Sequence, residues 1–207
     1  MGFPRDVSLG WESRAKPSRK ETEAALAAFL CKEEEPMQES MQPIRAAILI
    51  LSDKSFRGER EDKSGPALEQ LLKDHAKVVS TTILPDEKEE IVSYLRNVCD
   101  AGGADVIFTS GGTGFAPRDV TPEATMQVVE RAVPGIPEAM RAYSMQKTNR
   151  AMLSRAAAGI RGQTLIVNLP GSPKAVMECM EVILPVLAHA VQTLRGDTYE
   201  CARPVGQ

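Results

Sequence analysis

The chain has 207 residues, of which 43% are hydrophobic and 26% charged, and its formal net charge at pH 7 is -3. This length fits one compact domain with a sizeable core, since a domain takes roughly 100 to 200 residues. The slight acidity and the lack of a dense Lys/Arg block argue against a nucleic-acid-binding protein, because neutralising a phosphate backbone needs clustered cations.

Cysteine and histidine usage excludes further classes of function. The four cysteines form no C-x-x-C pair, and the two histidines have no ligand partner at metal spacing, so we expect no zinc site. The opening MGFPRDVSLGW lacks the long apolar segment of a signal peptide, and no stretch approaches ~20 apolar residues. We therefore expect neither export nor a membrane span, and we predict a cytoplasmic protein.

Residues 1–43 differ in composition from the rest of the chain. They contain four prolines, dense charge and one short helical pattern at 22–32. We expect a flexible N-terminal extension over 1–43, a domain over 44–197 and a C-terminal tail over 198–207. We assign no chemistry to the extension.

From Ile44 onward apolar strands alternate with amphipathic helices. The pattern predicts strands at 46–51, 78–84, 104–109 and 164–167. It predicts helices that begin at Ser64, Asp86, Thr121, Pro137 and Ser172–Pro173, the last with a kink at Pro185. Unbroken apolar strands between such helices indicate a mostly parallel sheet covered on both faces, hence an α/β fold with three layers.

Ligands of such a sheet bind at the carboxyl ends of its strands. The loops that follow Leu51, Leu84, Thr109 and Val167 should therefore meet at one edge. We look for the chemistry of the protein in these four loops.

The loop after the third predicted strand is rich in glycine. Its residues Gly111, Gly112, Thr113 and Gly114 can bring successive backbone N–H groups within hydrogen-bonding distance of an anion. The spacing matches neither the dinucleotide fingerprint nor the P-loop. A plain glycine turn is the alternative.

The loop after the fourth predicted strand contains Asn168, Pro170 and Gly171 and ends at Ser172. Serine at the N-cap with proline at the first helical position leaves N–H groups and the positive end of the helix dipole facing outward. An anion placed there gains about 0.3–1 kcal/mol from the dipole. Alternatively, Ser172 only caps the helix.

Three acids, Asp53, Asp86 and Asp119, follow the same strand ends. Carboxylates beside phosphate-binding loops repel phosphate unless a cation mediates, so this set points to Mg²⁺. Each acid also has a structural alternative. Asp86 with Glu89 nearly forms a capping box, and Asp119 could pair with Arg118.

Over residues 44–196 the chain resembles the molybdopterin adenylyltransferases, the family of the bacterial Mog enzymes and of the gephyrin G domain. The resemblance rests on five segments in the family's order: LSDKSFRGEREDKSGPAL, LPDEKEEI, TSGGTGFAPRDVTPEAT, MLSRAAAGIRGQTLIVNLPGSPKA and ILPVLAHAVQTLRG. It implies a MoaB/Mog-like three-layer fold, usually a homotrimer. It also implies a reaction in which Mg-ATP adenylates the terminal phosphate of molybdopterin and pyrophosphate is released, with possible handover of the product to a molybdenum-insertion protein.

The resemblance also assigns residues. Asp86 and Asp119 match acids that the family requires for catalysis, and we expect both to hold the metal with its ATP. The remaining matches are expected to bind nucleotide or pterin: Ser52, Asp53, Gly111, Gly112, Thr113, Gly114, Ser154, Arg155, Asn168, Pro170, Gly171 and Ser172.

The expected reaction needs no catalytic histidine or cysteine. Its nucleophile is a phosphate monoester with a second pKa of about 6, which is largely ionised at neutral pH. Two alternatives stay open: a non-catalytic molybdopterin-binding or scaffolding module, and a pyrophosphatase-type nucleotide hydrolase.

Overall fold

The structure is a computed structural model, and it describes residues 42–196. The predicted tail at 198–207 and residues 1–41 of the predicted extension lie outside the described residues. The domain boundaries given above therefore stay predictions.

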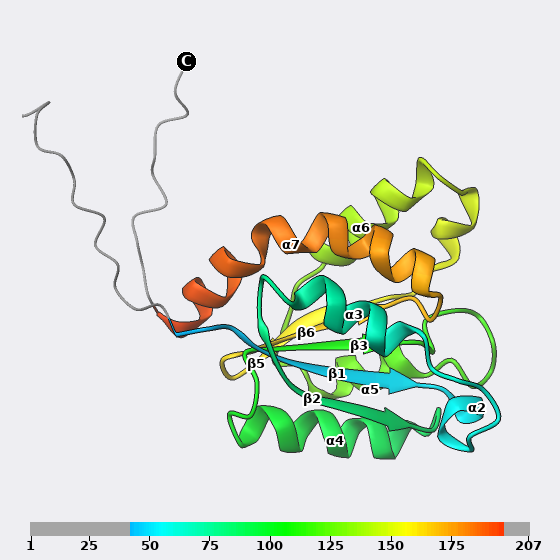
Figure 1. The fold of residues 1–207 in the computed structure, drawn as a ribbon, viewed down its shortest axis with the longest axis horizontal. Helices are drawn as coiled ribbons and strands as arrows, with labels where there is room; N and C mark the ends of the chain where they lie inside the picture. Colours follow the sequence, from blue (N-terminus) through cyan, green and yellow to red (C-terminus); the bar gives the residue numbers. More distant parts are fainter. Residues whose placement is uncertain (1–41, 197–207) are drawn as a thin grey trace, which may run out of the picture. The chain divides into compact units, whose positions relative to one another are not determined.

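A six-stranded, mostly parallel sheet forms the centre of the domain (Figure 1). Its strands are, in spatial order, β2 (Lys77–Leu84), β1 (Arg45–Leu51), β3 (Val106–Ser110), β6 (Thr164–Leu169), β5 (Ala158–Arg161) and β4 (Arg131–Ala132). The first four strands run parallel, β5 pairs antiparallel with β6, and β4 pairs antiparallel with β5. All four predicted strands are present, and the sequence pattern missed β4 and β5.

Helices cover both faces of this sheet (Figure 1), as the α/β prediction requires. The helical elements are α2 (Asp53–Phe56), α3 (Ser64–Leu72), α4 (Lys88–Asp100), α5 (Thr121–Val128), α6 (Gly135–Met145), the 3-10 helix η1 (Asn149–Leu153) and α7 (Pro173–Arg195). One face carries α3, α6 and α7, and the other carries α4 and α5. The three-layer architecture is confirmed.

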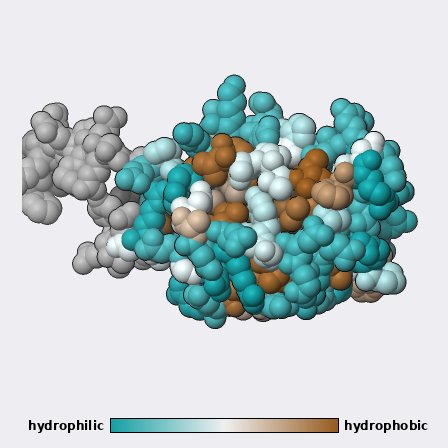
Figure 2. Space-filling view, turned by 90° about the horizontal axis from the view of Figure 1, so that it is seen from below, coloured by the Kyte–Doolittle hydropathy of each residue, from teal (hydrophilic) through white to brown (hydrophobic). Residues whose placement is uncertain are grey.

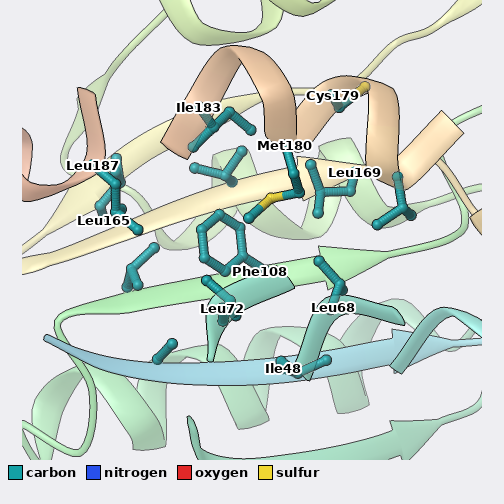
Figure 3. Close-up of a cluster of buried hydrophobic side chains, with 14 of the residues drawn as sticks. Ile48, Leu68, Leu72, Phe108, Leu165, Leu169, Cys179, Met180, Ile183 and Leu187 are labelled. Atoms are coloured by element: carbon teal, nitrogen blue, oxygen red, sulfur yellow. The ribbon is translucent and has the colours of Figure 1, made fainter. Parts of the chain in front are cut away.

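Alternate residues of the central strands enter two separate cores. Ile48 and Phe108 point toward α3 and α7, where they meet Leu72 and Met180 (Figure 3). Their strand neighbours, such as Leu49, enter the second core beneath α4 and α5. Each large side chain buried in this way contributes about 1.5–3 kcal/mol of transfer free energy. This packing fixes the register of the strands, and hence the positions of the loops at their ends.

Helix α7 is the longest element of the domain. Among residues 42–196 it is the one helix that could cross a membrane by length and composition, with a mean hydropathy of 1.4 over 18 residues. This helix is not a continuous apolar run, because Glu178, Glu181 and His189 interrupt it. The apolar side of α7 packs against the sheet through Met180, Ile183 and Leu187, so α7 serves as a core helix here (Figure 3). Pro185 lies within the helix, which continues to Arg195.

The exterior is a mixture of polar and apolar residues. Seen from below the view of Figure 1, the surface is largely hydrophilic, and hydrophobic residues gather in separate patches (Figure 2).

Candidate functional site

The loops after β1, β2, β3 and β6 meet at the carboxyl edge of the parallel strands, as the topology predicts. Two backbone hydrogen bonds join them. The Ser52 N–H donates to the Leu84 carbonyl at 3.1 Å, and the Gly111 N–H donates to the Leu169 carbonyl at 3.2 Å. The four loops therefore form one continuous surface.

The glycine loop packs too closely for side chains at its first two glycines. Gly111 has φ of 112°, and a Cβ there would lie 2.2 Å from the Leu51 carbonyl oxygen. Gly112 has φ of 64°, and a Cβ there would lie 2.2 Å from Thr121 Oγ1. L-residues rarely adopt such φ values, so both glycines are required by the backbone itself. The glycine-turn alternative thus holds for these positions, whether or not the loop also binds an anion.

Thr121 and Arg155 hold this loop by hydrogen bonds to its carbonyl oxygens. Thr121 Oγ1 donates to the Gly111 carbonyl at 2.9 Å, and the Thr121 N–H donates to the Gly112 carbonyl at 3.2 Å. Arg155 Nε donates to the Gly114 carbonyl at 2.6 Å, while its other nitrogens bind the Asp119 carbonyl and the Glu123 carboxylate. The structure thus uses Arg155 to position the loop. Sequence reasoning did not select Thr121, although its place at a helix start beside the glycines was a usable signal.

Asp53 and Asp86 are joined by reciprocal hydrogen bonds. The Asp53 N–H donates to Asp86 Oδ2 at 3.0 Å, and the Asp86 N–H donates to Asp53 Oδ1 at 3.1 Å. This arrangement replaces the capping box expected for Asp86, because α4 begins at Lys88 with Glu87 as its N-cap.

Arg118 binds the outer acids of the site. Its guanidinium donates to both oxygens of Asp53, at 2.7 and 2.9 Å, and to Glu87 at 2.8 Å. The expected alternative, a pair between Arg118 and Asp119, is therefore wrong. Hydrogen bonding from Arg118 lowers the pKa of Asp53.

The pKa of Asp86 is shifted in the opposite direction to that of Asp53. Burial raises the pKa of its carboxyl, the Asp53 N–H opposes this change, and the charges of Asp53 and Asp119 add to it. A carboxylate that is costly to ionise gains most from a nearby cation. Of Asp53 and Asp86, Asp86 is thus the better suited to a cation.

Asp86 and Asp119 lie beside the same glycine loop. Asp86 Oδ1 is 3.3 Å from the point that a Cβ on Gly112 would occupy, and Asp119 Oδ2 is 2.8 Å from the corresponding point on Gly114. Asp119 Oδ2 also accepts a hydrogen bond from the Ala116 N–H at 2.8 Å. The two carboxylates thus approach the loop where bare backbone is exposed.

The donor set fits Mg²⁺ bound together with a phosphorylated substrate. Within residues 42–196 no group of three or more His, Cys, Asp or Glu could by itself hold a metal ion. Mg²⁺ is usually bound through one or two carboxylates plus substrate phosphates, and Asp86 and Asp119 offer carboxylates of this kind. Asp53 is already paired with Arg118.

The second phosphate-loop candidate has the local structure expected for it. Ser172 is the N-cap of α7, its hydroxyl accepts the Ala175 N–H at 3.3 Å, and proline follows at the first helical position. A Cβ on Gly171 would lie 3.3 Å from the Gly111 Cα, so the two loops are in contact.

Asn168 has a structural position. Its side chain is fully buried, and its Nδ2 donates to Thr109 at 3.0 Å and to Thr125 at 2.8 Å. Its Oδ1 accepts the Ala157 N–H at 3.2 Å. The carboxamide therefore ties β6 to its neighbours, and we assign it no direct contact with a ligand.

Two cavities open on either side of these loops. The larger, about 540 Å³, lies between α6, η1 and the start of α7, and its lining includes Thr113, Gly114, Ser154, Pro170 and Ser172. The smaller, about 320 Å³, adjoins β1 and the start of α3, and its lining includes Ser52, Ser110 and Gly171. Seven of the predicted site residues line one of these two cavities, and the two cavities adjoin at Pro170–Pro173. Asp119 and Arg155 line a third cavity of about 460 Å³, and Asp86 lines none of the three.

The cavities differ in charge. The larger cavity is lined by Arg141, Lys147, Arg150 and Lys174, with Glu178 as an acid. The lining of the smaller one mixes cations and acids: Arg60, Lys63, Glu61 and Asp62. The larger cavity is therefore the better electrostatic match for a polyanion.

Comparison with known proteins identifies the family. Residues 47–189 match the family described as "Probable molybdopterin binding domain". The chain belongs to this family. The matched residues of this molybdopterin-binding domain family include every site residue predicted above, from Ser52 to Ser172.

Several relatives are similar to this chain over most of their own length. The molybdopterin adenylyltransferase of Helicobacter pylori is 39% identical over 160 residues, which are 76% of this chain and 91% of that protein. The molybdopterin adenylyltransferase of Escherichia coli K12 is 40% identical over 180 residues, 80% of this chain and 92% of that protein. The molybdopterin biosynthesis enzyme MoaB of Thermus thermophilus superposes with a TM-score of 0.71 at 49% identity, covering 74% of this chain and 97% of that one.

Proposed function

We propose that this protein is a molybdopterin adenylyltransferase, which transfers AMP from ATP to the terminal phosphate of molybdopterin and releases pyrophosphate. The observation that carries the proposal is the approach of Asp86 to Gly112 and of Asp119 to Gly114, in a glycine loop whose Thr113 and Gly114 line the larger cavity. Relatives that bear this activity in their names align over more than 90% of their own length.

The electrostatics of the two cavities suggest which substrate each takes. The larger, cationic cavity suits the phosphorylated pterin, with its phosphate near Ser172 and Lys174 at the start of α7. The smaller cavity, beside Ser52 and Ser110, suits the nucleotide. The loops at Gly111–Gly114 and Gly171 then lie where the two phosphate groups meet.

The residues of the chain act by positioning and by neutralising charge. The attacking phosphate is already ionised near neutral pH, so no side chain need remove a proton. Backbone N–H groups of the glycine loop and of the α7 N-terminus hold phosphate oxygens in line for displacement. Arg155 and Thr121 keep that loop in place through its carbonyls.

Asp86 and Asp119 would hold Mg²⁺ with the ATP phosphates. Such an ion neutralises the charge that develops as pyrophosphate leaves. The raised pKa of Asp86, caused by burial and by neighbouring acids, supports this assignment.

Incubation with Mg²⁺, ATP and molybdopterin tests the proposal. We expect pyrophosphate and adenylylated molybdopterin in equal amounts, with no product when either substrate or Mg²⁺ is omitted. Binding of molybdopterin without pyrophosphate release would instead identify a non-catalytic module. Release of AMP or phosphate from ATP alone would identify a nucleotide hydrolase.

We further propose a homotrimer that works in the cytoplasm and passes its product to a molybdenum-insertion protein. Large exposed apolar side chains such as Phe115 and Met152, 68% and 60% exposed, support self-association. The free thiols Cys99 and Cys179 suit a reducing compartment. Light scattering on the purified chain should give three times its mass of 22.5 kDa, and a monomer would contradict the assembly.

A further inference from the structure

Glu178 is the one acid among the charged residues of the described chain that line the larger cavity. The other charged residues that line this cavity of about 540 Å³ are cations: Arg141, Lys147, Arg150 and Lys174. A carboxylate there repels a phosphorylated substrate and weakens the attraction that the four cations supply. Its presence is explained if it contacts a different part of the substrate, one that offers hydrogen-bond donors.

The environment of Glu178 leaves it available to a ligand. Its side chain is 13% exposed, and one of its oxygens lies 3.7 Å from the Lys147 ammonium. That distance exceeds a normal hydrogen bond, so Lys147 balances the charge without occupying the acceptor sites. Lys147 is also shared, because it lies 3.7 Å from Glu181 and 4.4 Å from the centre of the Tyr143 ring.

The distance between Glu178 and Ser172, where the phosphate is proposed to bind, suits the length of a phosphorylated pterin. It follows the Ser172 N-cap by six residues on α7, which corresponds to about 9 Å along the axis. Both residues line the same cavity, as does Lys174, one turn before Glu178. A fused ring with a short phosphate-bearing arm spans a distance of this order.

The pyrimidinone edge of a pterin matches a carboxylate. This edge presents the ring N3–H and the 2-amino group side by side as donors. A carboxylate offers two acceptor oxygens that can receive both, and hydrogen bonds to an ionised acceptor are the stronger kind.

We propose that Glu178 determines specificity for the pterin ring by accepting hydrogen bonds from its N3–H and 2-amino groups while the phosphate lies near Ser172. This inference rests on the proposed function, since that function places the pterin in the larger cavity. It adds a residue and a chemical group to that site.

Paired titrations with pterin and lumazine test the inference, because lumazine carries a carbonyl in place of the 2-amino group. Both compounds fluoresce, so binding to the full chain can be followed directly. We expect the unmodified protein to bind pterin at least ~10-fold more tightly than lumazine. In Glu178→Gln the ratio should fall to about one, because the amide replaces one acceptor with a donor.

Glu181→Gln is the matched control. Glu181 lies at the same distance from Lys147 but is 57% exposed, and it belongs to the same helix one turn later. The control alters the other ion pair of Lys147, so loss of preference in both variants would assign the effect to Lys147 and overturn the inference. The inference is supported if Glu181→Gln keeps the preference for pterin and Glu178→Gln loses it.

Steady-state kinetics supply a second measurement. Glu178→Gln should raise KM for molybdopterin at least ~10-fold and leave KM for ATP within about twofold. Equal preference for pterin in Glu178→Gln and the unmodified protein, or no detectable pterin binding by the unmodified protein, would overturn the inference.

The two proposals fail separately. If the protein distinguishes pterin from lumazine through Glu178 but releases no pyrophosphate, adenylyl transfer is wrong and the role of Glu178 stands. If pyrophosphate is released and Glu178→Gln keeps the same ratio of pterin to lumazine affinity, the role of Glu178 is wrong and the proposed adenylyl-transfer activity is supported.

Discussion

At the scale of single residues, the acids of the site have distinct tasks that their partners determine. Each of Asp53 and Asp86 accepts the backbone N–H of the other. Asp53 is also neutralised by Arg118, whereas burial raises the pKa of Asp86. Asp119 faces the loop with one oxygen bound by the Ala116 N–H. We therefore expect Asp86 to contribute most of the charge that holds a metal ion, and its substitution tests the proposed metal site most directly.

We predict that Asp86→Asn reduces turnover at least ~10²-fold, because the amide lacks the charge that a metal ion requires. The amide oxygen can still accept the Asp53 N–H, so the free energy of unfolding should change by less than about 1 kcal/mol. Pyrophosphate release and urea unfolding measure the two effects. Unchanged turnover would remove Asp86 from the metal site.

The acid limb of the pH–rate profile provides a second prediction. Since burial and neighbouring acids raise the pKa of Asp86, the ionised form should be lost as pH falls through a value above the ordinary aspartate pKa of about 3.9. The value of kcat/KM should fall as this ionised fraction falls. Residual activity of Asp86→Asn should lack this step and keep the step of the substrate phosphate near pH 6. An identical acid limb in both proteins would exclude Asp86 as its source.

Residue roles were readable from sequence only where partners are local. Ser172 before Pro173 predicted a helix N-cap, and in the structure Ser172 is the N-cap of α7. Asp86 and Glu89 also looked like a cap, but the structure pairs Asp86 with the amide of Asp53, 33 residues away. Arg118 likewise binds Asp53 across 65 residues instead of its neighbour Asp119. Tertiary contacts decided both cases, and a single sequence does not display them.

At the scale of elements, the glycine loop depends on close contact with the strands around it. Gly111 lies against the Leu51 carbonyl of β1 and donates its N–H to Leu169 of β6. The loop is therefore fixed by the register of three strands. Its amides are held in position before any ligand arrives, which lowers the cost of binding an anion.

We predict that Gly111→Ala destabilises the domain by about 2–3 kcal/mol and strongly reduces pyrophosphate release. Its Cβ would lie 2.2 Å from a backbone oxygen, so β1 and the loop must separate. Gly162→Ala is the control, because Gly162 also has a positive φ, of 55°, but has no atom within 4 Å of its Cβ position. The control should lose only about 1 kcal/mol and retain activity. Equal activity in both variants would contradict a fixed loop.

The strength of the local pattern decided which elements sequence could predict. β1 is a continuous apolar run after Arg45, β3 and β6 each contain three consecutive apolar residues, and α7 has a long apolar side, so these elements were recognised. β4 is two exposed residues, and β5 contains glycine and arginine. These short strands form because β6 offers an edge to pair with, which is again a tertiary effect.

At the scale of the whole molecule, the edge opposite the site is closed by an ion cluster around Asp105. This buried carboxylate precedes β3 and accepts hydrogen bonds from Arg45 at the start of β1 and from Arg195 at the end of α7. Arg195 also donates to the Gln42 carbonyl at 2.9 Å. The cluster thus joins the first and last elements of the domain.

Asp105 should make the stability of the domain depend on acid pH. Burial alone would raise the pKa of its carboxyl, but hydrogen bonds from Arg45 and Arg195 outweigh burial and lower the pKa to about 2. Because the folded pKa is depressed, this stabilisation is present above the unfolded value of about 4 and is lost as pH falls toward 2. Its size is on the order of 2 kcal/mol.

Asp105→Asn should therefore lower the free energy of unfolding by about 2 kcal/mol at pH 7, and the difference from the unmodified protein should shrink as pH falls toward 2. Urea unfolding at several pH values measures this difference, which cancels the contributions of other carboxylates. Because the site lies at the other edge of the sheet, pyrophosphate release per folded molecule should be unchanged. A difference that persists at pH 2 would show that packing, not charge, accounts for the loss, whereas a loss of turnover would show that the two edges are coupled.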